Sequence, residues 1–169
     1  MRAVCLREPW LFLMLDIEDP DLRKTIENRS SKITKTLGPV LVKSSAPKRV
    51  SVGSPSYDNS DLPYYCRVRR QVLSWGWFPE ELFPTFSQLQ FGGIRGALNF
   101  ADLLEPGDLR DREHRWKFPE CFGYVVDRYV RFPFRPLKGG GQGIFYTEPT
   151  AEERALMLAA GLVLPSQEA

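Results

Sequence analysis

The stretch Lys24-Thr25-Ile26-Glu27-Asn28-Arg29 places one isoleucine within a dense set of polar side chains. Asp19-Pro20-Asp21 stands shortly before it and breaks any preceding helix, so the pattern predicts a strand over residues 24–29. Alternation along a strand puts Thr25, Glu27 and Arg29 on one side and the other three residues on the opposite side. We therefore expect Thr25, Glu27 and Arg29 to share one wall of a cleft.

The segments on either side of this strand carry the patterns of one helix and two more strands. Residues 2–6 are short, partly alternating and compatible with a strand. Glu8 and Pro9 follow in positions that the first turn of a helix tolerates, which predicts a helix over about residues 9–17. Gly38-Pro39 opens a strand over residues 40–44, whose β-branched content suits the interior of a sheet.

The remainder of the chain alternates between the two kinds of pattern. After a loop at 45–62, apolar residues recur every three to four positions from Tyr65 to Trp75, which predicts an amphipathic helix with a basic flank at 62–77. Glycines inside the strand pattern of residues 92–101 indicate a bulge or the tight curvature of a small barrel. The other expected elements are a short helix near 80–89, a charged loop at 105–118, a strand at 123–130, a bend at 134–143, a strand at 144–146 and a helix at about 150–160 that starts with a Thr150–Glu153 capping box. These patterns predict a single α+β domain over residues 1–169, with a helical and loop insertion at about 46–90.

Charge and composition restrict the classes of function. The chain carries 23 Lys and Arg against 21 Asp and Glu, so it is not a strongly basic protein that coats DNA, and a nucleic-acid site has to be local. The longest apolar run, residues 10–15, is too short to cross a bilayer, and we expect a cytoplasmic protein without a membrane partner. The 3 cysteines form no CxxC pair and the single histidine, His114, has no partner, so we expect neither a metal site nor a cofactor.

Four pieces of the chain together resemble a known family. They are Leu6-Arg7-Glu8-Pro9-Trp10, Lys24-Thr25-Ile26-Glu27-Asn28-Arg29, Gly38-Pro39-Val40-Leu41-Val42-Lys43-Ser44-Ser45, and Phe91-Gly92-Gly93-Ile94-Arg95-Gly96 with Gly141-Gln142-Gly143-Ile144-Phe145. In order and spacing they resemble the ASCH family, and this implies a PUA-like β-barrel of about five to six strands with flanking α-helices. The resemblance also implies binding of RNA or DNA and, as in some small members, hydrolysis of an acylated cytidine or cleavage of RNA. The turn at 16–23 is longer and more acidic than the family's usual link, and the family has no counterpart of residues 46–90.

The candidate ligand-binding residues come from the first helix, the strand at 24–29 and the strand at 40–44, which we expect to be its neighbour. They are Trp10, Lys24, Glu27, Asn28, Arg29, Lys43 and Ser44. Glu27 is suited to accept hydrogen bonds from a base edge and Arg29 to contact a phosphate, while Trp10 is suited to stack on a base. We expect a polar cleft that binds RNA or another single-stranded nucleic acid, with one base splayed out of the strand.

These side chains also have ordinary structural interpretations, which the sequence leaves open. Glu27 and Arg29 are equally suited to an internal ion pair that fixes the barrel, because buried charges need partners whatever the function. Lys24 fits a solvated surface position, and Trp10 fits the core because it opens an apolar helix.

Two other functions compete with nucleic-acid binding. One is a small hydrolase for an acylated or modified nucleoside or for RNA, with Lys24 and Glu27 as the reactive pair. The small enzymes of the resembled family pair a lysine with a threonine at the position that Glu27 occupies here, and this departure counts against the reaction. The other is a protein-interaction adaptor that uses the insertion at 46–90 and its aromatic residues Tyr64, Tyr65, Trp75, Trp77 and Phe78.

Overall fold

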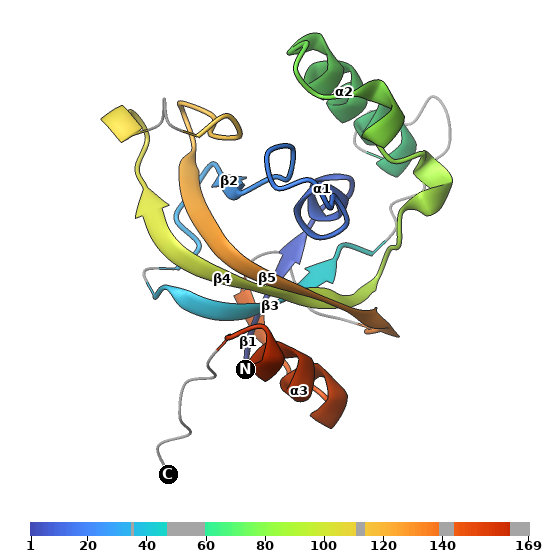
Figure 1. Ribbon diagram of the computed structural model, residues 1–169, viewed down its shortest axis with the longest axis vertical. Helices are drawn as coiled ribbons and strands as arrows, with labels where there is room; N and C mark the ends of the chain where they lie inside the picture. Colours follow the sequence, from blue (N-terminus) through green and yellow to red (C-terminus); the bar gives the residue numbers. More distant parts are fainter. Residues whose placement is uncertain (35, 47–59, 111–113, 139–143, 163–169) are drawn as a thin grey trace.

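The computed structural model describes residues 1–34, 36–46, 60–110, 114–138 and 144–162 (Figure 1). Its elements are, in chain order, β1 (Arg2–Leu6), α1 (Trp10–Leu15), β2 (Ile26–Arg29), β3 (Gly38–Ser44), α2 (Asp61–Ser74), the 3-10 turns η2 (Glu80–Leu82) and η3 (Phe86–Gln88), β4 (Gly93–Leu104), β5 (Phe122–Pro136), β6 (Ile144–Tyr146) and α3 (Ala151–Ala159). The predicted strands and the three main helices are confirmed, as is the capping box of Thr150 and Glu153 that begins α3. The helix expected near 80–89 is instead the two 3-10 turns.

The strands form a curled mixed sheet of six strands in the order β2-β5-β4-β3-β1-β6. Only the β1–β3 pair is parallel among the five pairings of this sheet, and the other four are antiparallel. The sheet wraps partly around α1, whereas α3 covers its outer face (Figure 1). The α+β class is therefore confirmed, and the sheet has the shape of a half-barrel.

The curl of the sheet comes from close approaches and register shifts between its two longest strands. A Cβ at Gly96 would lie 2.3 Å from the carbonyl oxygen of Val130, so only glycine allows β5 to come this close. The β4–β5 register shifts between Ile94 and Gly96, and Pro133 of β5 falls opposite this irregularity. A bulge tolerates a proline, and β5 therefore continues through residues 134–136, where a bend was expected. The rest of that expected bend, residues 139–143, lies outside the described residues.

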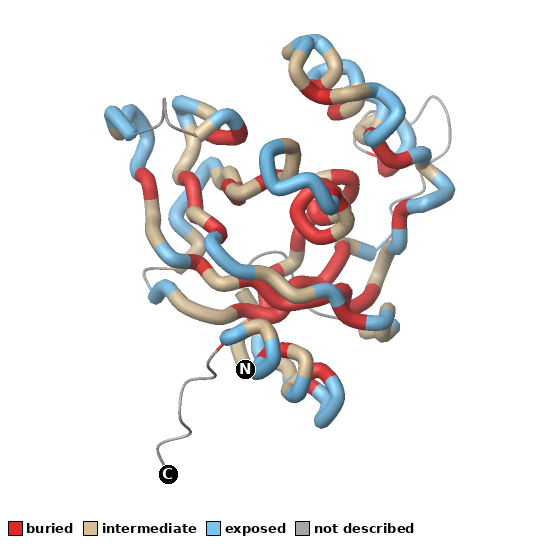
Figure 2. Tube along the Cα trace, in the orientation of Figure 1, coloured by how far each residue is buried: buried red, intermediate tan, exposed pale blue. Residues whose placement is uncertain are grey.

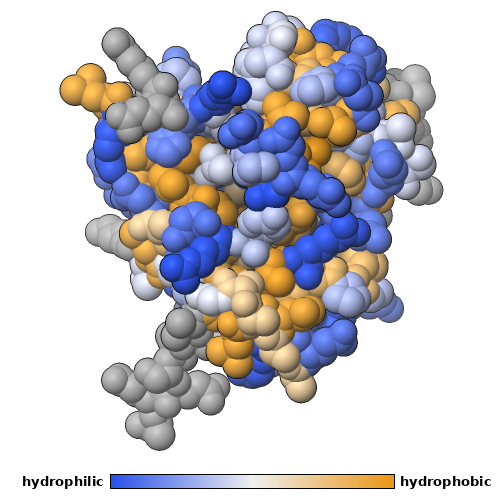
Figure 3. Space-filling view, viewed as in Figure 1, coloured by the Kyte–Doolittle hydropathy of each residue, from blue (hydrophilic) through white to orange (hydrophobic). Residues whose placement is uncertain are grey.

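Helix α2 lies at the open side of the curl, where its inner positions are buried and its outer positions are exposed (Figure 2). Hydrophilic side chains cover the outer edge of α2 at the upper right of Figure 3. Its buried Val68 and Val72 pack in a cluster with Leu13 and Trp116. Within the part of the chain that the structure describes, none of the helices is both long and apolar enough to span a membrane.

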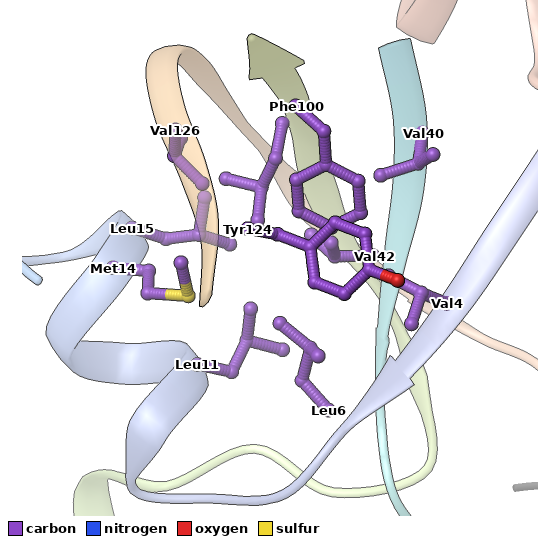
Figure 4. Packing of buried hydrophobic residues seen from close by; sticks show 11 residues of the cluster. Val4, Leu6, Leu11, Met14, Leu15, Val40, Val42, Phe100, Tyr124 and Val126 are labelled. Carbon is purple, nitrogen blue, oxygen red and sulfur yellow. The ribbon is translucent and has the colours of Figure 1, made fainter. Parts of the chain in front are cut away.

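The core on the concave side of the sheet joins α1 to four strands. Leu11, Met14 and Leu15 of α1 pack there against Phe100 and Tyr124 (Figure 4). On the outer side a separate cluster holds α3 against the sheet through its fully buried Met157. Helix α1 is thus fixed within the curl on its apolar side.

Both ends of α1 are also fixed by one buried arginine from β4. The guanidinium of Arg95 contacts the carboxylate of Glu8, just before the helix, with Nη1 and Oε1 at 2.8 Å, and contacts Asp16, just after it, through Nη2. The second oxygen of Glu8 accepts a hydrogen bond from the backbone N–H of Phe12 at 3.1 Å, and Asp16 also pairs with Arg131 at 3.1 Å. This arrangement determines where the side chains at the start of α1 are placed.

Candidate functional site

A polar pocket of about 240 Å³ opens beside the first residue of α1. The lining residues come from the β1–α1 connection, from α1, from β2 and the turn before it, from α2, and from the loop that leads into β5. They are Arg7, Trp10, Lys24, Glu27, Asn28, Arg29, Tyr64, Phe118 and Cys121. The structure therefore brings five of the seven expected residues together, although they lie on different elements.

The base of the pocket holds an ion triad centred on Glu27. Its Oε2 lies 3.2 Å from the Nζ of Lys24, and its Oε1 lies 2.9 Å from the Nε of Arg29. Lys24 is 2% exposed and also donates a hydrogen bond to the carbonyl oxygen of Ile26. Burial lowers the pKa of the Lys24 ammonium, and the Glu27 carboxylate acts in the opposite direction. The interpretation of Lys24 as a solvated surface lysine is therefore wrong, whereas the internal ion pair of Glu27 and Arg29 is present.

The strand alternation predicted for residues 24–29 applies only in part. Because β2 begins at Ile26, Lys24 precedes the strand and turns toward Glu27 instead of following the strand parity. Asn28 also lines the pocket, while Thr25 does not. The Asn28 side chain donates to the carbonyl oxygen of Trp116 at 2.6 Å and accepts from the N–H of Phe118 at 2.8 Å. Asn28 therefore holds the loop before β5 against β2.

The side of the pocket is an aromatic wall built by two helices. Trp10 of α1 donates its indole N–H to the hydroxyl of Tyr64 of α2 at 2.9 Å, and its ring packs edge-on against Phe118. The guanidinium of Arg7 lies 3.5 Å from the centre of the Tyr64 ring and 3.8 Å from the carboxylate of Asp61. Burial raises the pKa of the Tyr64 hydroxyl, so it stays protonated at neutral pH. Arg7 thus fastens the start of α2 to the pocket.

Lys43 and Ser44 do not line this pocket. The expectation that their strand neighbours the strand at 24–29 is wrong, because β5 and β4 lie between β2 and β3. The hydroxyl of Ser44 instead exchanges hydrogen bonds with the backbone of Gly93, and the Lys43 ammonium lies 5.9 Å from the centre of the Phe145 ring.

Sequence reasoning did not assign four of the lining residues to the pocket: Arg7, Phe118, Cys121 and Tyr64, the last of which it named only for the adaptor function. Arg7 is adjacent to the Glu8-Pro9 pair that marks the start of the helix, and this position was a signal that could have been used. Tyr64 lies in the expected insertion, where nothing in the local pattern reveals a contact with a residue 54 positions away. Of the other aromatic residues in that insertion, Phe78 is buried, and Trp75 and Trp77 pack edge-on against Trp116.

The arrangement favours a ligand that is anionic and also carries N–H donors. Arg7, Lys24 and Arg29 supply positive charge against the single carboxylate of Glu27. Each Glu27 oxygen has one cationic contact, and a carboxylate has about four lone-pair positions, so acceptor capacity is left for a ligand. No group of three or more metal-ligating side chains occurs among the residues that the structure describes.

Comparison of the chain with protein-family models finds no model that matches, and a search of curated proteins finds no similar sequence.

Proposed function

We propose that the pocket binds a base of RNA or of another single-stranded nucleic acid, and that the half-barrel is a PUA-like barrel of the ASCH type. The observation that carries the proposal is the Lys24–Glu27–Arg29 triad, whose Lys24 and Glu27 are buried, at the base of a pocket whose wall is aromatic. A flat, hydrogen-bonding ligand attached to a phosphate satisfies both features.

The triad supports base recognition because it places a carboxylate between two cations inside a restricted space. A carboxylate between two cations accepts hydrogen bonds from the amino and imino groups of a base edge, and it donates none. Arg29 is fixed by a second bond, from its Nη2 to the carbonyl oxygen of Cys5 at 2.8 Å. The acceptor is thus preorganised before a ligand enters.

The aromatic wall supports binding of an unpaired base. Trp10, Tyr64 and Phe118 line the pocket, and stacking on aromatic side chains contributes about 1 to 3 kcal/mol per base. A base in a duplex cannot reach a pocket between two helices and a loop, whereas single-stranded loops and ends can splay a base into it.

The proposal is tested by fluorescence anisotropy with short single-stranded RNA and DNA oligomers over a salt series. The double variant Lys24→Ala, Arg29→Ala is compared with wild type and with Arg154→Ala, which removes an arginine of α3 that pairs with Glu148 far from the pocket. We expect salt-sensitive binding that only the double variant loses, with folding of all three proteins checked by circular dichroism. Wild type that binds none of the oligomers would overturn the proposal.

A second candidate function is hydrolysis of an acylated nucleoside, which the lowered pKa of Lys24 favours. A lysine whose ammonium is disfavoured by burial is a better base or nucleophile than an ordinary one, and Glu27 lies within 3.2 Å to exchange a proton with it. Chromatography of an N-acylated cytidine incubated with the protein tests this activity. Turnover that Glu27→Gln slows while nucleoside binding is unchanged would establish the hydrolase.

A further inference from the structure

The exposed face of α2 carries two arginines that extend from the rim of the pocket. Arg67 and Arg70 are both exposed and stand three residues apart, so their side chains are neighbours on the helix surface. Arg67 lies over the ring of Tyr64, at 5.1 Å from its centre, and Tyr64 lines the pocket. The positive charge on α2 therefore continues directly from the pocket wall.

The Tyr64 ring contacts guanidinium groups from two elements. Arg7 lies 3.5 Å from the centre of the ring and lines the pocket, and Arg67 lies on the next turn of α2. The charges run from Arg29 at the base of the pocket, through Arg7, to Arg67 and Arg70 on the outside. This succession suits a chain of anionic groups better than a single anion.

The arginines of α2 differ in whether they already have an acidic partner. Arg69 pairs with Glu80 of η2, so its charge is compensated within the protein. Arg67 and Arg70 form no ion pair with any of the described residues 1–34, 36–46, 60–110, 114–138 and 144–162. Cations that have no acidic neighbour are the ones that gain most from a phosphate.

We infer that a nucleic-acid strand whose base lies in the pocket crosses the exposed face of α2, with backbone phosphates against Arg67 and Arg70. This inference rests on the proposed function and names its ligand class, an oligonucleotide rather than a free nucleoside. Phosphate contacts position a strand without reading its sequence, so α2 supplies affinity and the pocket supplies recognition of the base.

The test compares Arg67→Ala, Arg70→Ala with the control Arg69→Ala, which removes the same kind of side chain from the same helix at the position that already has an acidic partner. Anisotropy with labelled single-stranded RNA octamers is recorded from 0.05 to about 0.5 M salt, a range over which counterion release is measurable. Binding of each of the four ribonucleosides, which carry no phosphate, is measured by calorimetry on the same proteins.

The slope of log affinity against log salt is negative, and its magnitude is expected to be smaller by about 1.4 in the double variant. Each lost single-strand phosphate contact removes about 0.7. At 0.1 M salt this corresponds to roughly 25-fold weaker octamer binding, with nucleoside binding and the control unchanged. A double variant with the wild-type slope would overturn the inference and leave the pocket proposal intact. Wild type that binds neither octamers nor nucleosides would overturn both.

Discussion

Two glutamates of this chain, Glu8 and Glu27, are both buried and both held by cations, but only one of them faces a pocket. Glu8 contacts Arg95, which is 3% exposed, and the pair joins α1 to β4. Glu27 contacts Lys24 and Arg29, and all three of these residues line the pocket. The same ionic chemistry thus serves a structural role where it is closed off, and where a space adjoins it the role that we propose is binding.

The difference lies in what satisfies the carboxylate oxygens. Glu8 accepts from Arg95 and from the backbone N–H of Phe12, so both of its oxygens have protein donors within the helix anchor. Within the described part of the chain, the Glu27 oxygens contact only the side-chain cations of Lys24 and Arg29, and Arg29 is partly exposed. Substitutions in the two networks are therefore expected to separate stability from binding.

The largest effect is expected from Arg95→Leu. The change leaves the Glu8 carboxylate buried without its cation and removes a buried cation from Asp16, and breaking a buried pair costs about 3 to 5 kcal/mol. Urea unfolding measures the loss. The control Arg131→Ala removes a 62% exposed partner of Asp16 and should cost less than about 1 kcal/mol. Equal losses in the two variants would show that Arg95 does not clamp α1.

The next effect concerns the pH dependence of stability. Burial raises the pKa of the Glu8 carboxyl from 4.5 to about 7, with Arg95 and the Phe12 N–H acting in the opposite direction. Between these two values the folded protein holds a proton that the unfolded chain has released. The contribution of this group is therefore fully present below about pH 4.5 and is lost as the pH rises through about 7, by up to about 3 kcal/mol.

Glu8→Gln checks this dependence because glutamine keeps the shape and cannot titrate. In urea titrations, the unfolding free energy of wild type should fall relative to that of Glu8→Gln as the pH rises from 4.5 to 7. A difference that stays constant over this range would contradict the raised pKa.

The Lys24→Met variant tests the ion network of the pocket, for comparison with the Glu8–Arg95 network. Burial already disfavours the ammonium, Glu27 keeps Arg29 as a partner, and methionine fills a similar volume, so the unfolding free energy should change by less than about 2 kcal/mol. Oligonucleotide binding should nevertheless weaken about 10-fold or more, which corresponds to 1.4 kcal/mol. If Lys24→Met is strongly destabilised in urea but binds the oligonucleotide as wild type does, Lys24 contributes to stability and not to binding.

The smallest expected effect is that of Tyr64→Phe, which removes the hydroxyl that Trp10 contacts and should cost about 1 kcal/mol of stability. Tyr65→Phe is a matched control on the same helix, since the Tyr65 hydroxyl donates to the carbonyl oxygen of Pro84 outside the pocket. Both variants should be similarly destabilised in urea, but only Tyr64→Phe should weaken oligonucleotide binding. Equal binding by the two variants would show that the Trp10–Tyr64 hydrogen bond does not position the aromatic wall for the ligand.

The local elements were predictable because each has a local cause. The strand at 2–6, the helix that begins after Glu8-Pro9 and the capping box of α3 agree with the sequence patterns. The glycines within β4 correctly indicated bulges. The backbone of β5 at Val130 comes so close to Gly96 that only a residue without a Cβ fits there. Boundaries were less predictable, and β5 runs farther than expected since its pairing with β4 continues past Pro133.

The site was predictable only as far as one short segment carried it. Glu27, Asn28 and Arg29 lie on a single strand, so their shared location follows from the sequence. Lys43 and Ser44 were assigned to the same place because consecutive strands usually neighbour each other, and in this sheet β2 pairs with β5 instead. Tyr64 required knowledge of where the insertion folds back, which no local pattern contains.

The pairing of β2 also affects how the protein is made. Ile26 pairs with Val125 and Arg29 with Phe122, so the strand that carries the triad has to wait for a partner synthesised nearly a hundred residues later. At ribosomal rates of about 5 to 20 residues per second, the nascent chain spends roughly 5 to 20 s with Lys24, Glu27 and Arg29 translated and their strand unpaired. A chain that is truncated before Phe122 lacks the partner of β2, so the pocket is complete only after the start of β5 has been translated.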